Sequence, residues 1–380
     1  MTWDLFCSVI DNFGDIGVTW RLARQLAAEH GQSVRLWVDD LATFRRIRPE
    51  IDPELDTQHL AGVEVRRWTS PLPDVEPGEV VIEALACELP ETFVLRMAAK
   101  TPRPLWLNLE YLTAEAWAQG VHGLPSPHPR LPLTKYFFMP GFTPHSGGLT
   151  REAWLTAARD VFQADAHAQA RFWAGLAIPP HDTDELRVSL FSYENRALPS
   201  LLHAWSHGPR EVRALVPQGK ALPQIATWFG SDLPAPGEAL QRGRLTLHVL
   251  PMLDQDGYDR LLWACDLNFV RGEDSLLRAQ YAARPMAWQA YPQAERAHFA
   301  KLDAFLSLYR QDMPAGPAQT THAFWHGWNE EADVGAHWHD WLAHLDEHAA
   351  HARRWDARLA EQPDLASKLL IFCEKLMEKS

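Results

Sequence analysis

The sequence contains only four cysteines among its 380 residues, and no two of them form a CxxC pair. Their wide spacing argues against a zinc site and against a disulfide framework. No run of eighteen apolar residues is present, so we expect no membrane span. The amino terminus has no basic segment leading into an apolar one, which argues against a secretory signal. We therefore predict a reduced, soluble, cytoplasmic protein.

The sequence also lacks an excess of positive charge, because 36 Lys and Arg stand against 49 Asp and Glu, giving a net charge of −13. This balance argues against a general nucleic-acid binder and against a protein of the membrane surface. Repeats and low-complexity tracts are absent. With 17 Trp and 16 Phe the chain can bury far more apolar area than disordered sequences can. Its length predicts two or three domains at roughly 150 residues each.

What is present is an alternation of strand and helix patterns, beginning with a βαβ unit. A buried strand over residues 3–10 leads through a glycine-containing turn into a helix, and a second strand follows at 33–38. We expect further strands at 78–83 and 104–109. Residues 120–150, rich in Gly, Pro and His, are expected to form long loops, and residues 151–176 one helix.

A second α/β series begins after Pro179-Pro180, where adjacent prolines predict a linker. Its expected strands are at residues 187–193, 211–216, 245–250, 267–270 and 285–289. We therefore predict two Rossmann-like domains, at 1–180 and 181–359, with ligands bound outside the carboxyl ends of the strands. The last segment, about 360–380, is expected to form a helix that packs back on the first domain.

Two carboxylates flank the turn after the first strand, in the segment Asp11-Asn12-Phe13-Gly14-Asp15. Such a pair could hold a cation, or could divide the work of a general base and an orienting group. The alternative is purely structural, with Asp15 capping the helix and Asp11 ending the strand. The turn is neither a GxGxxG fingerprint nor an EF-hand loop.

The segment Arg271-Gly272-Glu273-Asp274-Ser275 lies between an expected strand and an expected helix. A helix amino terminus there would suit a phosphate, with Arg271 adding a forked donor and Ser275 a hydroxyl. The alternative is that the acidic residues and the serine only serve the first helical turn.

Aromatic residues end another expected strand at Phe191 and Tyr193, and Gln255 lies in a later loop. These side chains could stack on a nucleobase and read its edge, but ordinary core and turn residues would look the same. Histidines crowd residues 337–351, and His344 and His348 have helical i, i+4 spacing. Without an HExxH motif or a nearby thiolate, we predict no functional metal there.

Five segments together resemble the protein-arginine rhamnosyltransferases that modify bacterial elongation factor P. They are WDLFCSVIDNFGDIGVTWRLARQLA, LWVDDL, LNLEYLTAEAW, SLFSYEN and FVRGEDSLLRAQ, in order across the first 290 residues. The resemblance implies a GT-B glycosyltransferase architecture, with two Rossmann-like domains facing across a cleft and a carboxyl-terminal helix crossing back to the first. It implies inverting transfer of rhamnose from dTDP-β-L-rhamnose to one arginine of elongation factor P, with neither metal nor cofactor.

The resemblance also implies roles for individual residues. Asp15 would be the general base, with Asp11 and Glu273 also taking part in catalysis. The acceptor would be bound by the first turn, and the donor by the second domain. The implied acceptor-binding residues are Asp11, Asn12, Phe13 and Asp15. The implied donor-binding residues are Phe191, Tyr193, Gln255, Arg271, Glu273, Asp274 and Ser275.

Overall fold

The computed structural model describes residues 1–10, 13–182 and 184–378, and contacts within the chain group them into two compact units. Unit 1 comprises Met1–Ala153 with Ala360–Ser380, and unit 2 comprises Trp154–Leu359. The division therefore falls at 153/154, whereas we expected it at 180. Packing explains the difference, because Arg159 donates to the carbonyl of Tyr281 and pairs with Asp356 at 2.6 Å, both within unit 2.

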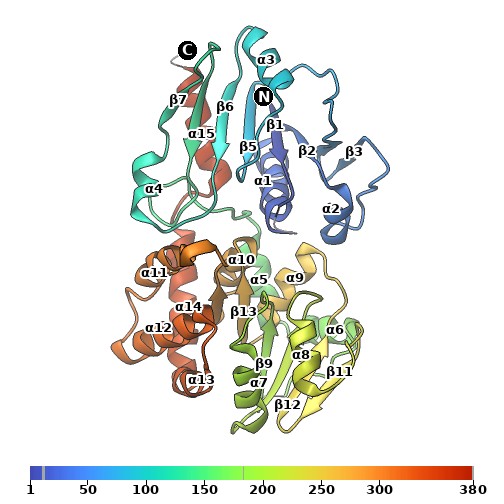
Figure 1. Ribbon diagram of the computed structural model, residues 1–380, viewed down its shortest axis with the longest axis vertical. Helices are drawn as coiled ribbons and strands as arrows, with labels where there is room; N and C mark the ends of the chain where they lie inside the picture. Colours follow the sequence, from blue (N-terminus) through green and yellow to red (C-terminus); the bar gives the residue numbers. More distant parts are fainter. Residues whose placement is uncertain (11–12, 183, 379–380) are drawn as a thin grey trace. The chain divides into compact units, whose positions relative to one another are not determined.

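Unit 1 is built on one eight-stranded sheet in the order β3-β4-β2-β1-β5-β6-β8-β7 (Figure 1). All neighbours are parallel except the two outer pairs, β3 with β4 and β7 with β8. The strands are β1 Thr2–Cys7, β2 Ser33–Val38, β3 Thr57–Leu60, β4 Val63–Arg67, β5 Val80–Ala84, β6 Leu105–Leu109, β7 Pro125–Pro127 and β8 Thr134–Phe138. The helices are α1 Gly14–His30, α2 Leu41–Ile47, α3 Glu91–Ala99, α4 Ala116–Val121 and α15 Leu365–Met377.

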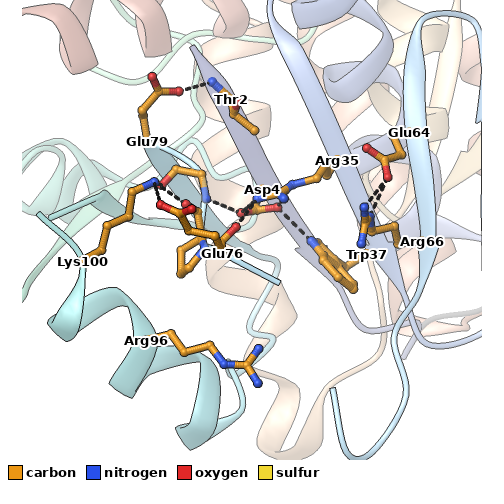
Figure 2. Close-up of polar contacts among 12 residues, drawn as sticks. Thr2, Asp4, Arg35, Trp37, Glu64, Arg66, Glu76, Glu79, Arg96 and Lys100 are labelled. Atoms are coloured by element: carbon orange, nitrogen blue, oxygen red, sulfur yellow. Dashed lines mark hydrogen bonds and ion pairs between the residues drawn. The ribbon is translucent and has the colours of Figure 1, made fainter. Parts of the chain in front are cut away.

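A buried carboxylate in the middle of β1 ties three segments of unit 1 together (Figure 2). Asp4 is fully buried and accepts two hydrogen bonds from Arg35, at 2.7 and 2.6 Å, and one from the indole of Trp37 at 2.9 Å. The backbone N–H of Gly78 donates to it at 2.7 Å. A Cβ at Gly78 would lie 2.5 Å from the carbonyl oxygen of Thr2, so only glycine allows this approach.

Helix α15 packs on α1 and β6 of unit 1, as expected. Its N-cap Asp364 accepts from Ser367 N–H and from the side-chain amide of Gln25 in α1. The N–H of Leu365 donates to the carbonyl of Leu149 at 2.9 Å. The last helix therefore completes the unit that the first strand begins.

Unit 2 contains a six-stranded sheet in the order β11-β12-β10-β9-β13-β14, parallel except for β11 with β12. The strands are β9 Glu185–Leu190, β10 Glu211–Val216, β11 Ala239–Arg242, β12 Leu245–Val249, β13 Leu267–Arg271 and β14 Met286–Gln289. The helices are α5 Leu155–Ala164, α6 Ala166–Gly175, α7 Leu198–His207, α8 Leu222–Phe229, α9 Gln255–Ala264, α10 Asp274–Tyr281, η1 Ala294–Arg296, α11 His298–Tyr309, α12 Ala315–Glu330, α13 Gly335–Leu342 and α14 Leu345–Ala360.

Three local expectations were wrong. Residues 120–150 contain the end of α4 and the antiparallel pair β7–β8, not only loops. The helix expected at 151–176 is two helices, because Asp165 ends α5 and its side chain caps α6 by accepting from the N–H groups of His167 and Ala168. The first strand ends at Cys7 rather than at residue 10. Among the described residues, no helix is long and apolar enough to cross a membrane.

Candidate active site

The strand order of unit 1 reverses between β1 and β5. Strands β2 and β4 lie on one side of β1, whereas β5, β6 and β8 lie on its other side. In open parallel sheets, ligands bind outside the carboxyl ends of the strands at such a reversal. The register pairs Cys7 with Val38 and with Ala84, so these three strands end together. The turn after β1 therefore lies at the position where a site is expected.

Asp15 lies at this reversal and is 2 % exposed. Its carboxylate accepts a hydrogen bond from the N–H of Ile10 at 2.8 Å, and the Tyr111 hydroxyl lies 3.3 Å from its Oδ1. Helix α1 has Phe13 as its N-cap, with no side-chain capping bond. The capping alternative for Asp15 is therefore wrong, since this carboxylate contacts groups outside its own helix.

A second carboxylate fixes the residues that lead into the turn. Asp39, which follows β2, accepts from the Ser8 hydroxyl at 2.5 Å and from the N–H of Val9 at 2.9 Å. Asp11 and Asn12, for which we expected catalytic and acceptor-binding roles, lie outside the described residues. Phe13 is half-buried, and the guanidinium carbon of Arg46 lies 5.1 Å from its ring centroid.

Tyr111 is a site residue that the sequence analysis did not single out. It follows β6, and its hydroxyl lies between Asp15 and the carbonyl oxygen of Leu85, 3.1 Å away. The signal was present, because Tyr111 belongs to the LNLEYL segment at a strand end. Cys7, at the end of β1, has a raised thiol pKa, caused first by burial and also by the nearby charge of Asp15.

The strand order of unit 2 reverses between β9 and β13. Strands β10 and β12 lie on one side of β9, whereas β13 and β14 lie on its other side. Phe191 follows β9, and its N–H donates to the carbonyl of Phe269 in β13. Arg271 ends β13, and its guanidinium carbon lies 4.3 Å from the ring centroid of Phe191 and 4.4 Å from that of Tyr193. The structure therefore brings together these three predicted donor-binding residues at one reversal.

The turn from β13 into α10 is shaped by Ser275 and by Gly272. The Ser275 hydroxyl accepts from the N–H of Arg271 at 3.0 Å and donates to the carbonyl of the same residue. Gly272 has a positive φ of 61°, which favours glycine at this position. Glu273 is the N-cap of α10, and its carboxylate accepts from the ammonium of Lys301 at 2.6 Å. The serine thus fixes the loop, and Glu273 is held by a cation from α11.

The remaining predicted donor residues are connected through Tyr258, a half-buried side chain of α9 whose hydroxyl oxygen is buried. Tyr258 packs edge-on against Phe191, with ring centroids 5.7 Å apart. Burial raises the pKa of Tyr258, and the charge of Asp274 raises it further. Gln255 is buried on the first turn of α9. Tyr258 of the same helix packs against Phe191.

Lys220 is a further cation at this edge of the sheet that sequence reasoning missed. It follows β10, is exposed, and its ammonium lies 5.8 Å from the ring centroid of Tyr193. Its only signal was its place after a parallel strand. Cations beside two aromatic rings at the amino terminus of α10 can hold a phosphate and a stacked base.

The histidine-rich segment does not form the i, i+4 chelate considered above. The His348 ring stacks on Trp341 with centroids 4.4 Å apart, and its centroid is 6.4 Å from that of His344 at an 81° angle. Burial lowers the pKa of His348 to about 4, with the charge of His344 as the next cause. His348 therefore serves as a neutral ring in the core of unit 2.

Two doubly wound sheets, each with polar groups at its strand-order reversal, are typical of the two-domain GT-B fold. The fold is shared with a solved glycosyltransferase from Rickettsia africae, at a TM-score of 0.54 and 8 % identity, covering 100 % of this chain and 99 % of that one. At this identity the likeness concerns the fold alone.

The family is shown at the level of sequence. The family model for elongation factor P (EF-P) rhamnosyltransferase EarP matches residues 3–374. A protein-arginine rhamnosyltransferase of Pseudomonas putida is 49 % identical over 371 residues, 98 % of each chain. The structure solved to explain EarP-mediated arginine glycosylation of translation elongation factor EF-P is 37 % identical, with a TM-score of 0.70, covering 98 % of this chain and 99 % of that one. The chain belongs to the EarP family of protein-arginine rhamnosyltransferases.

Proposed function

We propose that this chain transfers rhamnose from dTDP-β-L-rhamnose to one arginine side chain of elongation factor P, with inversion at the anomeric carbon. The observation that carries the proposal is the family match over residues 3–374, which includes both strand-order reversals. Unit 2 would bind the donor and unit 1 the acceptor.

The donor part of the proposal rests on the charges and rings of unit 2. Phe191 and Tyr193 would support the thymine base, because aromatic faces stack on nucleobases. Arg271 and the amino terminus of α10 would hold the diphosphate, and Lys220 would add a second positive charge beside it. These groups supply fixed positive potential where the leaving diphosphate gains charge, so no metal is needed in the proposed reaction.

The acceptor part rests on the carboxylates of unit 1. A guanidinium keeps its proton at neutral pH, and its nitrogen lone pairs are delocalised, which makes it a poor nucleophile. Asp11 and Asp15 would clamp it by charge-assisted hydrogen bonds and orient one nitrogen, with Asn12 and Phe13 completing the pocket. The hydrogen bonds from Ile10, and from Tyr111 when it donates to Asp15, fix that carboxylate in place before the acceptor arrives.

The proposed step is a single displacement. A guanidinium nitrogen forms a bond to the anomeric carbon of rhamnose while the bond from that carbon to the diphosphate oxygen breaks. The electron pair leaves with dTDP, and the proton of the attacking nitrogen passes to a carboxylate oxygen of Asp15. Attack from the face opposite the leaving group inverts the anomeric carbon. Glu273, held by Lys301, would orient the donor sugar beside this centre.

Intact mass spectrometry of elongation factor P, incubated with this protein and dTDP-β-L-rhamnose, tests the proposal. We expect a gain of one deoxyhexose, absent when the acceptor arginine is replaced by lysine and absent with D15N. Turnover of dTDP-β-L-rhamnose without a mass gain would mean another acceptor. Tight binding of elongation factor P without turnover would mean a binding module and would refute the proposed reaction.

We also propose that the protein works in the cytoplasm, where elongation factor P acts. All four cysteines are free thiols buried in the two units, which suits a reducing compartment.

A further inference from the structure

Helices α11 and α12 bring three potential metal ligands together on unit 2, outside the residues assigned to the donor. His322 and His326 are one helical turn apart on α12, with their rings stacked at a centroid distance of 4.3 Å. The Nε2 of His326 lies 2.6 Å from Oδ1 of Asp303 on α11. One nitrogen or oxygen from each of the three side chains lies within 4.8 Å of the others.

We propose that Asp303, His322 and His326 bind one divalent transition-metal ion of the Zn²⁺ class. Imidazole nitrogens and a carboxylate oxygen are ligands that zinc takes at about 2.0–2.2 Å, usually four at a time. Two imidazoles and one carboxylate make three, and water completes the tetrahedron. The same set suits Ni²⁺ and Co²⁺, whereas Mg²⁺ and Ca²⁺ prefer oxygen ligands alone.

The present contacts need only a small rearrangement to bind an ion. When the His326 ring carries its proton on Nδ1, its Nε2 and the Asp303 carboxylate direct lone pairs into the same space. In a tetrahedral site with bonds of this length, the ligand atoms lie about 3.4 Å from one another. The three ligand atoms here already lie within 4.8 Å of one another.

The surroundings allow a hydrated ion to enter. The side chain of Asp303 is 53 % exposed and that of His326 is 22 % exposed. Arg310 is a positive charge that interacts with both His322 and Asp303. Its guanidinium donates to the carbonyls of Leu306 and Ala318 and is thereby held on the backbone. The Asp303 carboxylate offsets this charge at the site itself.

A bound ion would fasten α11 to α12. Helix α11 also carries Lys301, which lies two residues before Asp303. Lys301 pairs with Glu273 in the donor segment. The role inferred for the ion is therefore structural, acting on the helix that supports this ion pair rather than on the reacting atoms.

The test uses tag-free, full-length protein freed of metal by a chelator and titrated calorimetrically with ZnCl₂ at pH 7.5. We expect saturable binding of one equivalent and a rise in the thermal unfolding midpoint. H322Q and D303N should each weaken the binding about tenfold or more, since even supporting residues of metal sites contribute 10- to 100-fold. The chain offers a matched control in His203 and His207 on α7, which are also one turn apart and stacked at 4.1 Å. H203Q should leave zinc binding unchanged.

Each outcome decides the matter. Absence of a saturable equivalent in the wild-type protein overturns the site, as does equal binding by the wild type, H322Q and D303N. Equal losses in H203Q and H322Q would mean nonspecific binding to histidine pairs and would also overturn it. A measurement independent of folding defects uses Co²⁺ with the wild-type protein. Visible bands of four- or five-coordinate cobalt that zinc displaces support the site, and the weak spectrum of hexaaqua cobalt refutes it.

Discussion

The two strand-order reversals have the same topology and opposite chemistry. In unit 1 the reversal between β1 and β5 holds the carboxylates of Asp15 and Asp39 and the hydroxyl of Tyr111. In unit 2 the reversal between β9 and β13 places Arg271 against two aromatic rings, with Lys220 beside them. The same topology therefore carries carboxylates at the reversal of unit 1, and an arginine with two aromatic rings at the reversal of unit 2. The residues that follow the strands, not the fold, decide which ligand each unit suits.

The substitution with the largest expected effect removes the base from unit 1. D15N should lower the rate of rhamnose transfer about 1000-fold, within the range for a lost general base, because the amide cannot take the proton. Affinity for dTDP, measured by calorimetry, should stay within about twofold. The matched control is D40N, since Asp40 caps α2 and contacts Thr43 only locally. If D15N lost dTDP affinity to the same extent as transfer rate, the assignment of acceptor to unit 1 and donor to unit 2 would be contradicted.

The next largest effect concerns the cation of unit 2. R271M should weaken dTDP binding about 10- to 100-fold, the value of charge-assisted hydrogen bonds to a phosphate. Binding of thymidine, which has no phosphate, should change little, whereas F191L should weaken both ligands alike. R242M is the control, because Arg242 also lies over an aromatic ring, 4.4 Å from the centroid of Trp228, but on β11. Unchanged dTDP affinity in R271M would contradict the donor assignment.

A smaller effect is expected for Tyr111 in unit 1. Y111F removes the hydroxyl beside Asp15 and leaves the ring, so the rate of transfer should fall about fivefold, the value of one hydrogen bond near 1 kcal/mol. The loss should appear in kcat rather than in the KM for dTDP-β-L-rhamnose. A change in the donor KM alone would place the effect in unit 2 and contradict this role.

In unit 2 the corresponding positioning residue is Lys301. K301M should reduce kcat/KM about three- to tenfold, because Glu273 loses the partly buried cation that orients it. K301R keeps the charge and should recover most of the activity. If both variants behave like wild type in steady-state kinetics, the ion pair is only structural.

The smallest expected effect is a loss of stability of unit 2 in acid. Burial lowers the pKa of His348 and of His351 to about 4, and the unfolded chain titrates near 6.5. Below about pH 6.5 the unfolded state therefore binds more protons. The part of the free energy of unfolding of unit 2 that depends on these two histidines should be fully present above pH 6.5. It should be lost as the pH falls toward 4. Urea unfolding followed by tryptophan fluorescence at pH 7.5 and 5.5 measures this difference, and H348Q should reduce it. An identical pH dependence in H348Q would contradict the assignment.

The sequence predicted the presence of strands and of the turns that follow them better than it predicted contacts across the sheet. The βαβ start, the RGEDS turn and the second strand series follow from local patterns of apolar and glycine residues, and the structure has them. The sequence has Tyr111 and Lys220 after strands, but it could not show which side chains they meet, because each joins its site through the order in which the strands are arranged. The strand β7 was missed since its three residues, Pro-Ser-Pro, carry no strand pattern, and only an edge position tolerates them.

The contribution of α15 to unit 1 has a consequence for synthesis. Proteins emerge from the ribosome amino terminus first, and domains commonly fold in that order. Here the sheet begun by β1 receives its covering helix only after the whole of Trp154–Leu359 has been translated. The surface of α1 and β6 that α15 buries is exposed throughout that interval. The residues of unit 2 are continuous in the sequence, so unit 2 can complete its folding before unit 1 does. The first residues to be translated therefore belong to the unit that folds completely last.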